Sequence, residues 1–281
     1  MTTQEQTLAG KTLIISGGSR GIGEAIAVRA ARDGANVAML AKTSDPHPKL
    51  PGTIYTAAKA IEEAGGQALP IVGDVRDDEC VADAIAQTAR QFGGIDIVVN
   101  NASALDLTAT EHISMKKYDL MQDINARGAF LLSKSAIPHL RRALNPHILT
   151  LSPPITLDPR WFDGVPTAYT ISKFSMSLVT IGLSQELRGD GIAANSLWPR
   201  TTIDTAAVRN VLGTELTARS RSTAVMRDAA YSILTSPATE VSGQCFIDDE
   251  VLAADGVTDF SQYRLCESED DLELDFWMVR T

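Results

Sequence analysis

Short runs of apolar residues alternate along the chain with segments whose apolar positions recur at helical spacing. The apolar runs predict strands over 12–16, 36–41, 67–74, 95–101, 147–152 and 192–199, and a seventh near 244–248. Helices are expected between them, the two longest over 115–142 and 167–189. Regular alternation of strands and helices is typical of a parallel sheet covered on both faces. The pattern therefore predicts an α/β fold, in which a single doubly wound domain contains a seven-stranded parallel sheet.

The composition narrows the range of partners. The chain has 281 residues, of which 44% are hydrophobic, and this is enough for one large core. Its net charge is -10, and an acidic surface repels phosphate backbones and anionic lipid, so nucleic acid is not an expected partner. No apolar run reaches the length of a membrane span, and the first residues lack the apolar centre of a secretory signal.

The residue types that bind metals or form disulfides are scattered. No CxxC pair occurs, and the four histidines lie far apart at His47, His112, His139 and His147, so no metal site is expected. The three cysteines are also widely spaced, which suits reduced thiols in a cytoplasmic protein.

A glycine-rich stretch, ISGGSRGIG, joins the first predicted strand to the first predicted helix. Glycines permit a tight turn and a close approach of the backbone to a pyrophosphate, while the helix N-terminus offers unpaired N–H groups to an anion. An ordinary strand-to-helix turn is the alternative, but the position at the first strand favours a dinucleotide site. The cofactor contacts expected from this stretch are Gly17, Ser19, Arg20, Gly21, Ile22 and Gly23.

The residues after the second strand bear on the choice of cofactor. A site for NAD commonly places an acid there to bond the ribose 2′-hydroxyl, whereas a site for NADP places a cation near the 2′-phosphate. Lys42 takes that position, and Arg20 adds a second cation. Each charge alone is more often a solvated surface group, but together they favour NADP(H) over NAD(H). Further contacts are expected where the third and fourth strands end, at Asp74, Val75, Asn101 and Ala102.

The stretch AYTISK places Tyr169 and Lys173 four residues apart, and therefore on one face of a predicted helix. A free phenol titrates near ~10, too high for acid–base work at neutral pH. A neighbouring ammonium group lowers the pKa of the phenol, and proton exchange with a substrate oxygen then becomes practical. The pattern is loose by itself, and a boundary tyrosine beside a surface lysine is the alternative.

Taken in order, these motifs resemble the short-chain dehydrogenase/reductase family over residues 8–247 or so. The resemblance implies a Rossmann domain that interconverts an alcohol and a carbonyl, including lipid or steroid-like substrates. It implies a proton relay in which Tyr169 is the acid/base, Lys173 bonds the nicotinamide ribose, Ser152 holds the substrate oxygen and Asn125 holds a relay water. It further implies a contact of Pro199 with nicotinamide, a substrate lid over 201–221, and pairing of subunits through the helix over 167–189 into a dimer or tetramer.

The chain departs from the family pattern at several positions. The family usually has two serines where the fifth strand ends, but Pro153 follows Ser152 here, so a structural role for Ser152, with Thr156 as a substitute donor, stays open. Arg200 stands where glycine usually follows Pro199, and it is expected to bind a substrate acid or cofactor phosphate, or to form a surface ion pair. Residues 248–281 form an acidic extension whose aromatic end is expected to dock on something, and no sterol-carrier domain is expected within the 281 residues.

Three alternatives remain open at this stage. The first is a protein that binds the cofactor without turnover, suggested by Pro153 at the position where the family usually has its second serine. The acidic, aromatic-ended extension motivates an interaction protein on the same fold. A third alternative is an enzyme specific for NAD(H) rather than NADP(H).

Overall fold

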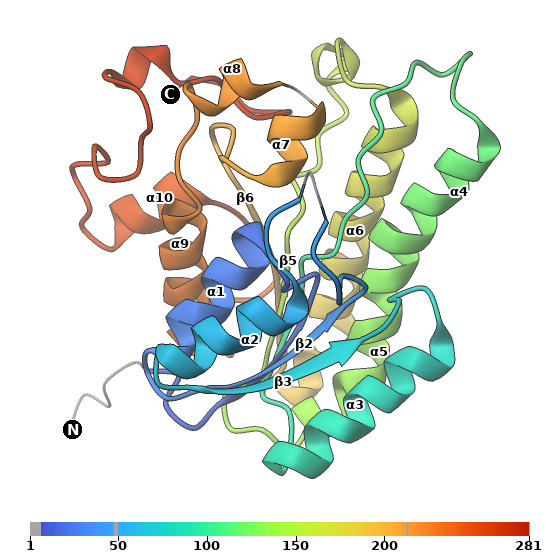
Figure 1. Ribbon diagram of the computed structural model, residues 1–281, viewed down its shortest axis with the longest axis vertical. Helices are drawn as coiled ribbons and strands as arrows, with labels where there is room; N and C mark the ends of the chain where they lie inside the picture. The colour runs from blue at the N-terminus through green and yellow to red at the C-terminus, as the bar shows by residue number, and fades with distance from the viewer. Residues whose placement is uncertain (1–6, 48–49, 212, 281) are drawn as a thin grey trace.

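A seven-stranded sheet forms the centre of the computed structural model, which describes residues 7–47, 50–211 and 213–280 (Figure 1). Pro48 and Lys49 of the proline-rich loop, and Leu212 of the expected lid, lie outside these residues. The strand order is β3-β2-β1-β4-β5-β6-β7, and every neighbouring pair is parallel. The strands are β1 (Thr12–Ser16), β2 (Asn36–Ala41), β3 (Gln67–Val72), β4 (Ile97–Asn100), β5 (His147–Thr150), β6 (Ala193–Trp198) and β7 (Cys245–Ile247). This confirms the predicted α/β fold with a seven-stranded parallel sheet.

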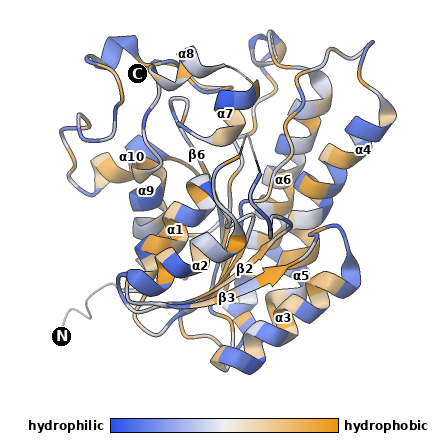
Figure 2. Cartoon of the chain, in the orientation of Figure 1, coloured by the Kyte–Doolittle hydropathy of each residue, from blue (hydrophilic) through white to orange (hydrophobic). Residues whose placement is uncertain are grey.

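Helices cover both faces of the sheet (Figures 1 and 2). One face is covered by α1 (Gly21–Ala31), α2 (Ile54–Glu63), α9 (Ala224–Thr235) and α10 (Asp248–Ala254). The other face is covered by α3 (Asp78–Phe92), α5 (Gly128–Leu140) and α6 (Thr167–Glu186). Two short helices, α7 (Ala206–Val211) and α8 (Thr214–Thr217), follow β6 within the expected lid.

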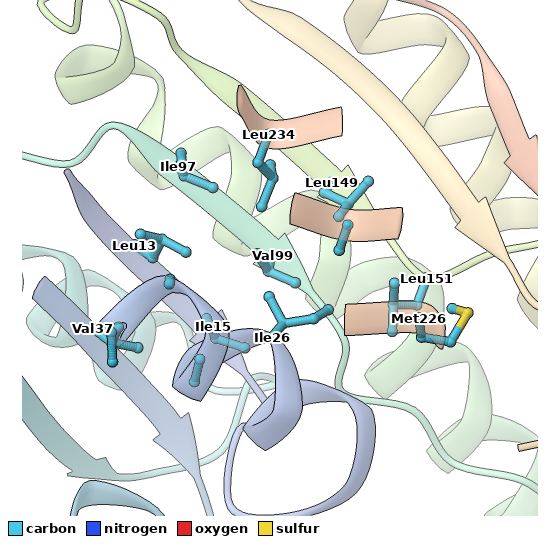
Figure 3. Close-up of a cluster of buried hydrophobic side chains, with 14 of the residues drawn as sticks. Leu13, Ile15, Ile26, Val37, Ile97, Val99, Leu149, Leu151, Met226 and Leu234 are labelled. Carbon is cyan, nitrogen blue, oxygen red and sulfur yellow. The ribbon is translucent and has the colours of Figure 1, made fainter. Parts of the chain in front are cut away.

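The alternation of side chains along β1 explains why its central residues are apolar on both faces. Leu13 and Ile15 point into one buried cluster, drawn in Figure 3 with Ile26 of α1 and Met226 of α9. Ile14, between them in sequence, points into the cluster on the opposite face. Because helices bury both faces, the central positions of β1 are apolar on both sides, and the strand reads as a continuous apolar run rather than an alternating one.

The long helical segment expected over 115–142 differs from the prediction in one respect. It consists of α4 (Met115–Gln122), a π-helical turn over Asp123–Arg127 and α5. π-turns are uncommon and frequently occur at functional sites. This one contains Asn125, which is fully buried.

The C-terminal segment, residues 272–279, returns to the carboxyl end of the sheet and pairs with the residues that follow β6. The amide N–H of Thr202 donates to the carbonyl of Glu273 at 2.9 Å, and the amide N–H of Asp275 donates to the carbonyl of Arg200 at 3.0 Å. Trp198 Nε1 donates to the Phe276 carbonyl at 3.1 Å. The aromatic end of the chain therefore docks, as expected, and it docks on the same chain, beside β6.

None of the helices in the described part of the chain combines the length and apolar character needed to cross a membrane. Within the same residues, no group of three or more histidine, cysteine or acidic side chains is arranged to hold a metal ion.

Candidate active site

A cavity of about 530 Å³ opens at the carboxyl ends of the strands, where the strand order reverses between β1 and β4. In parallel α/β sheets, ligands bind at this position, and the volume is within the usual range for ligand pockets. All but one of the residues expected to contact the cofactor line this cavity. They are Gly17, Ser19, Arg20, Gly21, Ile22, Lys42, Asp74, Val75, Asn101, Ala102, Tyr169, Lys173 and Pro199. The exception is Gly23, which lies behind the cavity wall.

The glycine loop is shaped by close packing against Asn101. The side-chain amide of Asn101 donates to the carbonyls of Ser16 and Gly17 at 3.1 and 2.8 Å. A Cβ atom at Gly17 would lie 2.9 Å from that amide nitrogen, and one at Gly23 would lie 2.5 Å from it. Gly17 also has a φ of 70°, in the left-handed region that favours glycine. Gly23 therefore shapes the loop without reaching the cavity.

The N-terminus of α1 faces the same cavity. Arg20 occupies the capping position in an extended conformation, and its side chain makes no capping hydrogen bond. The first N–H groups of the helix are thus available to an anion, and the helix dipole adds a partial positive charge there. A loop of small residues with free N–H groups fits the pyrophosphate of a dinucleotide.

Charged residues surround the end of the cavity beside β2 and β3. Lys42 Nζ lies 3.1 Å from Asp74 Oδ2, and Arg76 holds the same carboxylate with two nitrogens. The Arg76 guanidinium is the main reason why the pKa of Asp74 lies well below its usual range. Arg20 donates through Nη2 to the Gly52 carbonyl at 3.2 Å, while its buried Nε has no hydrogen-bond partner. Lys42 is therefore already paired with an acid, and Arg20 retains an unpaired donor.

Tyr169 and Lys173 lie on one face of α6 and are both buried at the inner wall of the cavity. Lys173 Nζ donates to the Leu151 carbonyl at 2.6 Å and lies 4.8 Å from the ring centroid of Trp198. The ring of Tyr169 stacks on Trp277, with centroids 5.9 Å apart and an interplanar angle of 25°.

The pKa of Tyr169 departs from the direction expected from sequence. Burial raises this pKa, and the negative charge of Asp275 raises it further. Burial lowers the pKa of Lys173, while the charge of Asp275 opposes that change. The pKa of the phenol therefore shifts in the direction opposite to the expected lowering, because loss of solvation and the charge of Asp275 both raise it.

The other two expected relay residues are buried near the cavity but do not line it. Asn125 donates through Nδ2 to the Ala104 carbonyl at 3.0 Å and to Ser172 Oγ at 2.9 Å, and its Oδ1 accepts from the Ala104 N–H. It thus ties the segment after β4 to α6. The hydroxyl of Ser152 is fully buried and has no hydrogen-bond partner. Thr156 accepts from the Asp158 N–H in the following loop and does not line the cavity.

Comparison with known proteins gives the family. Residues 11–215 match the short chain dehydrogenase family. The chain belongs to this family. The hydroxysteroid dehydrogenase-like protein 2 of Danio rerio is 55% identical over 91% of this chain, and that of Homo sapiens is 47% identical over 92%. The chain spans 61% of the length of each of these relatives. A crystal structure of a short chain dehydrogenase from Mycobacterium thermoresistibile is 56% identical, covers 97% of this chain and 96% of its own, and superposes with a TM-score of 0.92.

Arg200 stands where short-chain dehydrogenases usually have glycine. Its side chain is buried and binds the C-terminal part of the chain. Its Nε contacts both oxygens of Asp249 at 2.8 Å, its Nη2 contacts Glu250, and its Nη1 donates to the Val279 carbonyl at 3.2 Å. Its side chain is 9% exposed. The expected ion pair is therefore present, whereas the expected exposure of the charge is wrong.

The structure adds residues that the sequence analysis did not place at the site. Asp275 and Phe276 line the cavity, and Trp277 packs behind them against Tyr169. The available signal was the aromatic pair in an otherwise acidic segment, which indicated docking but not where. The lid residues Ile203, Thr205, Ala206, Ala207, Val208 and Asn210 also line the cavity, within the range expected for the lid.

We expect Arg200→Ala to destabilise the fold by roughly 3–5 kcal/mol, because it removes a buried cation and leaves Asp249 without its main partner. The matched control is Arg219→Ala, which breaks an exposed pair with Glu273 of the same segment and should cost less than about 1 kcal/mol. Urea denaturation of both variants measures the difference. Equal free energies of unfolding would contradict the anchoring role of Arg200.

Proposed function

We propose that this short-chain dehydrogenase is an NADP(H)-dependent oxidoreductase that interconverts an alcohol and a carbonyl on a lipid or steroid-like substrate. The observation that carries the proposal is the sharing of one cavity by the glycine loop and the pair Tyr169 and Lys173. The glycine loop and the free N-terminus of α1 fit a pyrophosphate, and the paired side chains fit proton transfer at a substrate oxygen.

In this proposal, Tyr169 moves the proton. Its raised pKa keeps the phenol protonated, which supports donation of a proton to a carbonyl oxygen during reduction. A bound nicotinamide cofactor supplies the hydride chemistry, and the protein supplies binding, orientation and the proton. Lys173 lines the same cavity, and in this proposal it bonds the ribose of that cofactor. The unpaired hydroxyl of Ser152 is a candidate donor to the substrate oxygen, and Asn125 holds the segment after β4 against α6.

The walls of the cavity support an apolar substrate. Trp198, Leu105, Ile124 and Phe276 line it beside the catalytic pair, and a third buried cluster of apolar residues continues behind them. The relatives from Danio rerio and Homo sapiens carry the name hydroxysteroid dehydrogenase-like protein 2, which agrees with a lipid or steroid-like class.

The preference for NADP(H) over NAD(H) rests on Arg20 and Lys42. Both line the cavity close to the ends of β2 and β3, and Arg20 has an unpaired buried N–H. A 2′-phosphate would compete with Asp74 for Lys42. An enzyme specific for NAD(H) is the alternative. It is favoured if Lys42 stays paired with Asp74 when the cofactor binds and so does not contact it.

A cofactor-binding protein without turnover is the second candidate function. Pro153 motivates it, because this proline stands at the position where the family usually has its catalytic serine. The neighbouring Ser152 hydroxyl is buried without a partner. If a substrate reaches this hydroxyl, the enzyme is favoured; if none does, the protein without turnover is favoured.

We also propose that the protein acts in the cytoplasm. Cys80, Cys245 and Cys266 are free in the structure, as expected for a reducing compartment. A disulfide between any two of them in protein isolated from cells would argue against this location.

Subunit pairing through α5 and α6 completes the proposal. Apolar side chains stand exposed on both neighbouring helices: Phe130 on α5, and Ile171 and Leu178 on α6. Exposed apolar residues that gather on one surface commonly mark an interface. A homodimer or homotetramer would cover them.

The first prediction concerns Tyr169. We expect Tyr169→Phe to lower kcat for carbonyl reduction by about a hundredfold or more, because the proton donor is lost, while cofactor affinity stays the same. Tyr55→Phe, which removes an exposed phenol outside the cavity, should leave kcat unchanged. Steady-state kinetics on a panel of lipid and steroid carbonyls checks this. Binding of cofactor by the unaltered protein with no turnover on that panel would favour the second candidate function.

The second prediction concerns cofactor choice. We expect the protein to bind NADPH more tightly than NADH. Arg20→Ala and Lys42→Ala should each lower the affinity for NADPH by about tenfold, because each removes a charge-assisted hydrogen bond to the phosphate. Affinity for NADH should not change. Lys59→Ala, on the exposed face of α2, is the control. Titrations followed by nicotinamide fluorescence measure these affinities, and a preference for NADH would overturn the phosphate contact.

The third prediction concerns assembly. Light scattering coupled to size-exclusion chromatography should give a mass of two or four chains. Leu178→Glu, which places a charge on the exposed face of α6, should yield single chains. Leu144→Glu changes an exposed leucine outside both helices and should leave the mass unaltered. A single-chain mass for the unaltered protein would refute the pairing.

A further inference from the structure

Trp277, in the C-terminal segment, combines two features that are unfavourable for a tryptophan. Its φ is 64°, and within the described part of the chain it is the one non-glycine residue in the left-handed region. Its indole Nε1 is buried and has no hydrogen-bond partner among the described residues. A bulky residue at positive φ and a buried unpaired donor both cost free energy, and they persist only where the surrounding structure compensates for them. Outliers of this kind cluster at functional sites.

Four aromatic rings contact this buried indole. The rings of Phe174, Trp198 and Phe276 lie 5.4, 5.7 and 5.7 Å from it, measured between centroids. The fourth is the ring of Tyr169, which lies closest to parallel with the indole, at 5.9 Å and 25°. Residues of α6, of β6 and of the C-terminal segment thus meet at the indole, and their packing holds it in one position.

The backbone around Trp277 is anchored on both sides. Trp198 Nε1 donates to the carbonyl of Phe276, the residue before it, and Arg200 Nη1 donates to the carbonyl of Val279, two residues after it. Trp198 therefore both packs on the indole and bonds the chain next to it. Contacts from outside the segment impose the strained conformation of Trp277.

The orientation of Tyr169 depends on its ring contacts. Its hydrogen bonds within the described residues are those of its backbone, including a donation to the Pro166 carbonyl and an acceptance from Ser172 Oγ, and none of them holds the phenol. The second side-chain torsion of a tyrosine has a broad distribution, so the rotamer alone does not fix the ring plane. The stack with Trp277 and the edge contact with Phe276, at 6.0 Å and 69°, therefore set that plane.

We propose that Trp277 is a positioning residue of the active site: its indole fixes the plane of the Tyr169 ring, so that the phenol faces the cavity in the orientation that proton transfer requires. A proton donor must lie within hydrogen-bond reach of the substrate oxygen, and a misplacement of about 1 Å can lower a rate by about a hundredfold. Tyr169 lines the cavity, whereas Trp277 packs behind it. Trp277 therefore acts through Tyr169. The inference rests on the proposed role of Tyr169 as the proton donor.

The first test measures the ring of Tyr169 without cofactor or turnover. Carbon-13 relaxation of labelled tyrosine rings, with the Tyr169 signal identified by its loss in Tyr169→Phe, gives an order parameter for the ring. Trp277→Leu should lower this order parameter by about a quarter, the difference between a rigid and a flexible site, because leucine offers no flat face. Trp277→Phe retains an aromatic face and should restore most of the order. Trp161→Leu is the matched control, because Trp161 packs on the same apolar cluster without a ring contact to Tyr169 in the described residues.

The second test determines whether Trp277 acts through Tyr169. In the active enzyme, Trp277→Leu should lower kcat for carbonyl reduction by about tenfold and leave the KM for the cofactor unchanged. In a Tyr169→Phe background, the same substitution should lower the residual kcat by less than about twofold, because the phenol that it positions is already absent. A purely structural role would produce the same loss in both backgrounds.

An unchanged order parameter in a folded Trp277→Leu protein would overturn the proposal. An equal change in Trp161→Leu, or an equal loss of kcat in both backgrounds, would also overturn it. Thermal unfolding monitors the fold, and Trp277→Gly provides a second variant if the first does not fold, because glycine suits a φ of 64°. Absence of turnover in the unaltered protein would count against the proposed function alone, because the motion of the Tyr169 ring still decides the role of Trp277.

Discussion

The site depends on the parallel pairing of β1 with β4 at the centre of the sheet. The chain runs outward from β1 to β2 and β3, and then returns to the other side of β1 to continue with β4. Because the connections leave in opposite directions at this point, the loops after β1 and β4 separate, and a crevice forms between them. The Asn101 side chain bonds across it to the carbonyls of Ser16 and Gly17, which fixes the glycine loop at the mouth of the cavity.

Burial of charge is the main energetic theme of this site. Lys173 and Tyr169 are buried and Asp275 is partly buried, and desolvation is the largest influence on the pKa of each. A buried ammonium group needs polar or aromatic partners, and the Leu151 carbonyl and the Trp198 ring provide these for Lys173. An environment of this kind, prepared before the substrate binds, avoids reorganisation during the reaction.

Buried charges also hold the C-terminal segment, through ion pairs that Arg200 and Arg221 form. Arg200 and Arg221 both contact Asp249, and Arg221 also contacts Glu269. Such pairs contribute little net stability compared with apolar packing, but breaking one leaves an uncompensated charge and is costly. They therefore fix where the segment lies. In this molecule, the charge cluster keeps Asp275 and its aromatic neighbours at the cavity, so residues nearly eighty positions apart in sequence, Trp198 and Phe276, share a hydrogen bond.

The sequence by itself determined the seven strands, the helices between them as far as α6, and most of the cavity wall. Strand and helix positions follow from local periodicity, and the glycine loop, Lys42, Asp74 and the pair on α6 follow from motifs that lie within single loops or helices. It did not reveal the π-turn at Asn125 or the unpaired state of the Ser152 hydroxyl, because both depend on neighbours from other elements. The direction of the pKa change at Tyr169 and the places of Arg200 and Asp275 were decided only by tertiary structure. Burial and long-range pairing set these properties, and neither is encoded in the spacing of residues along the chain.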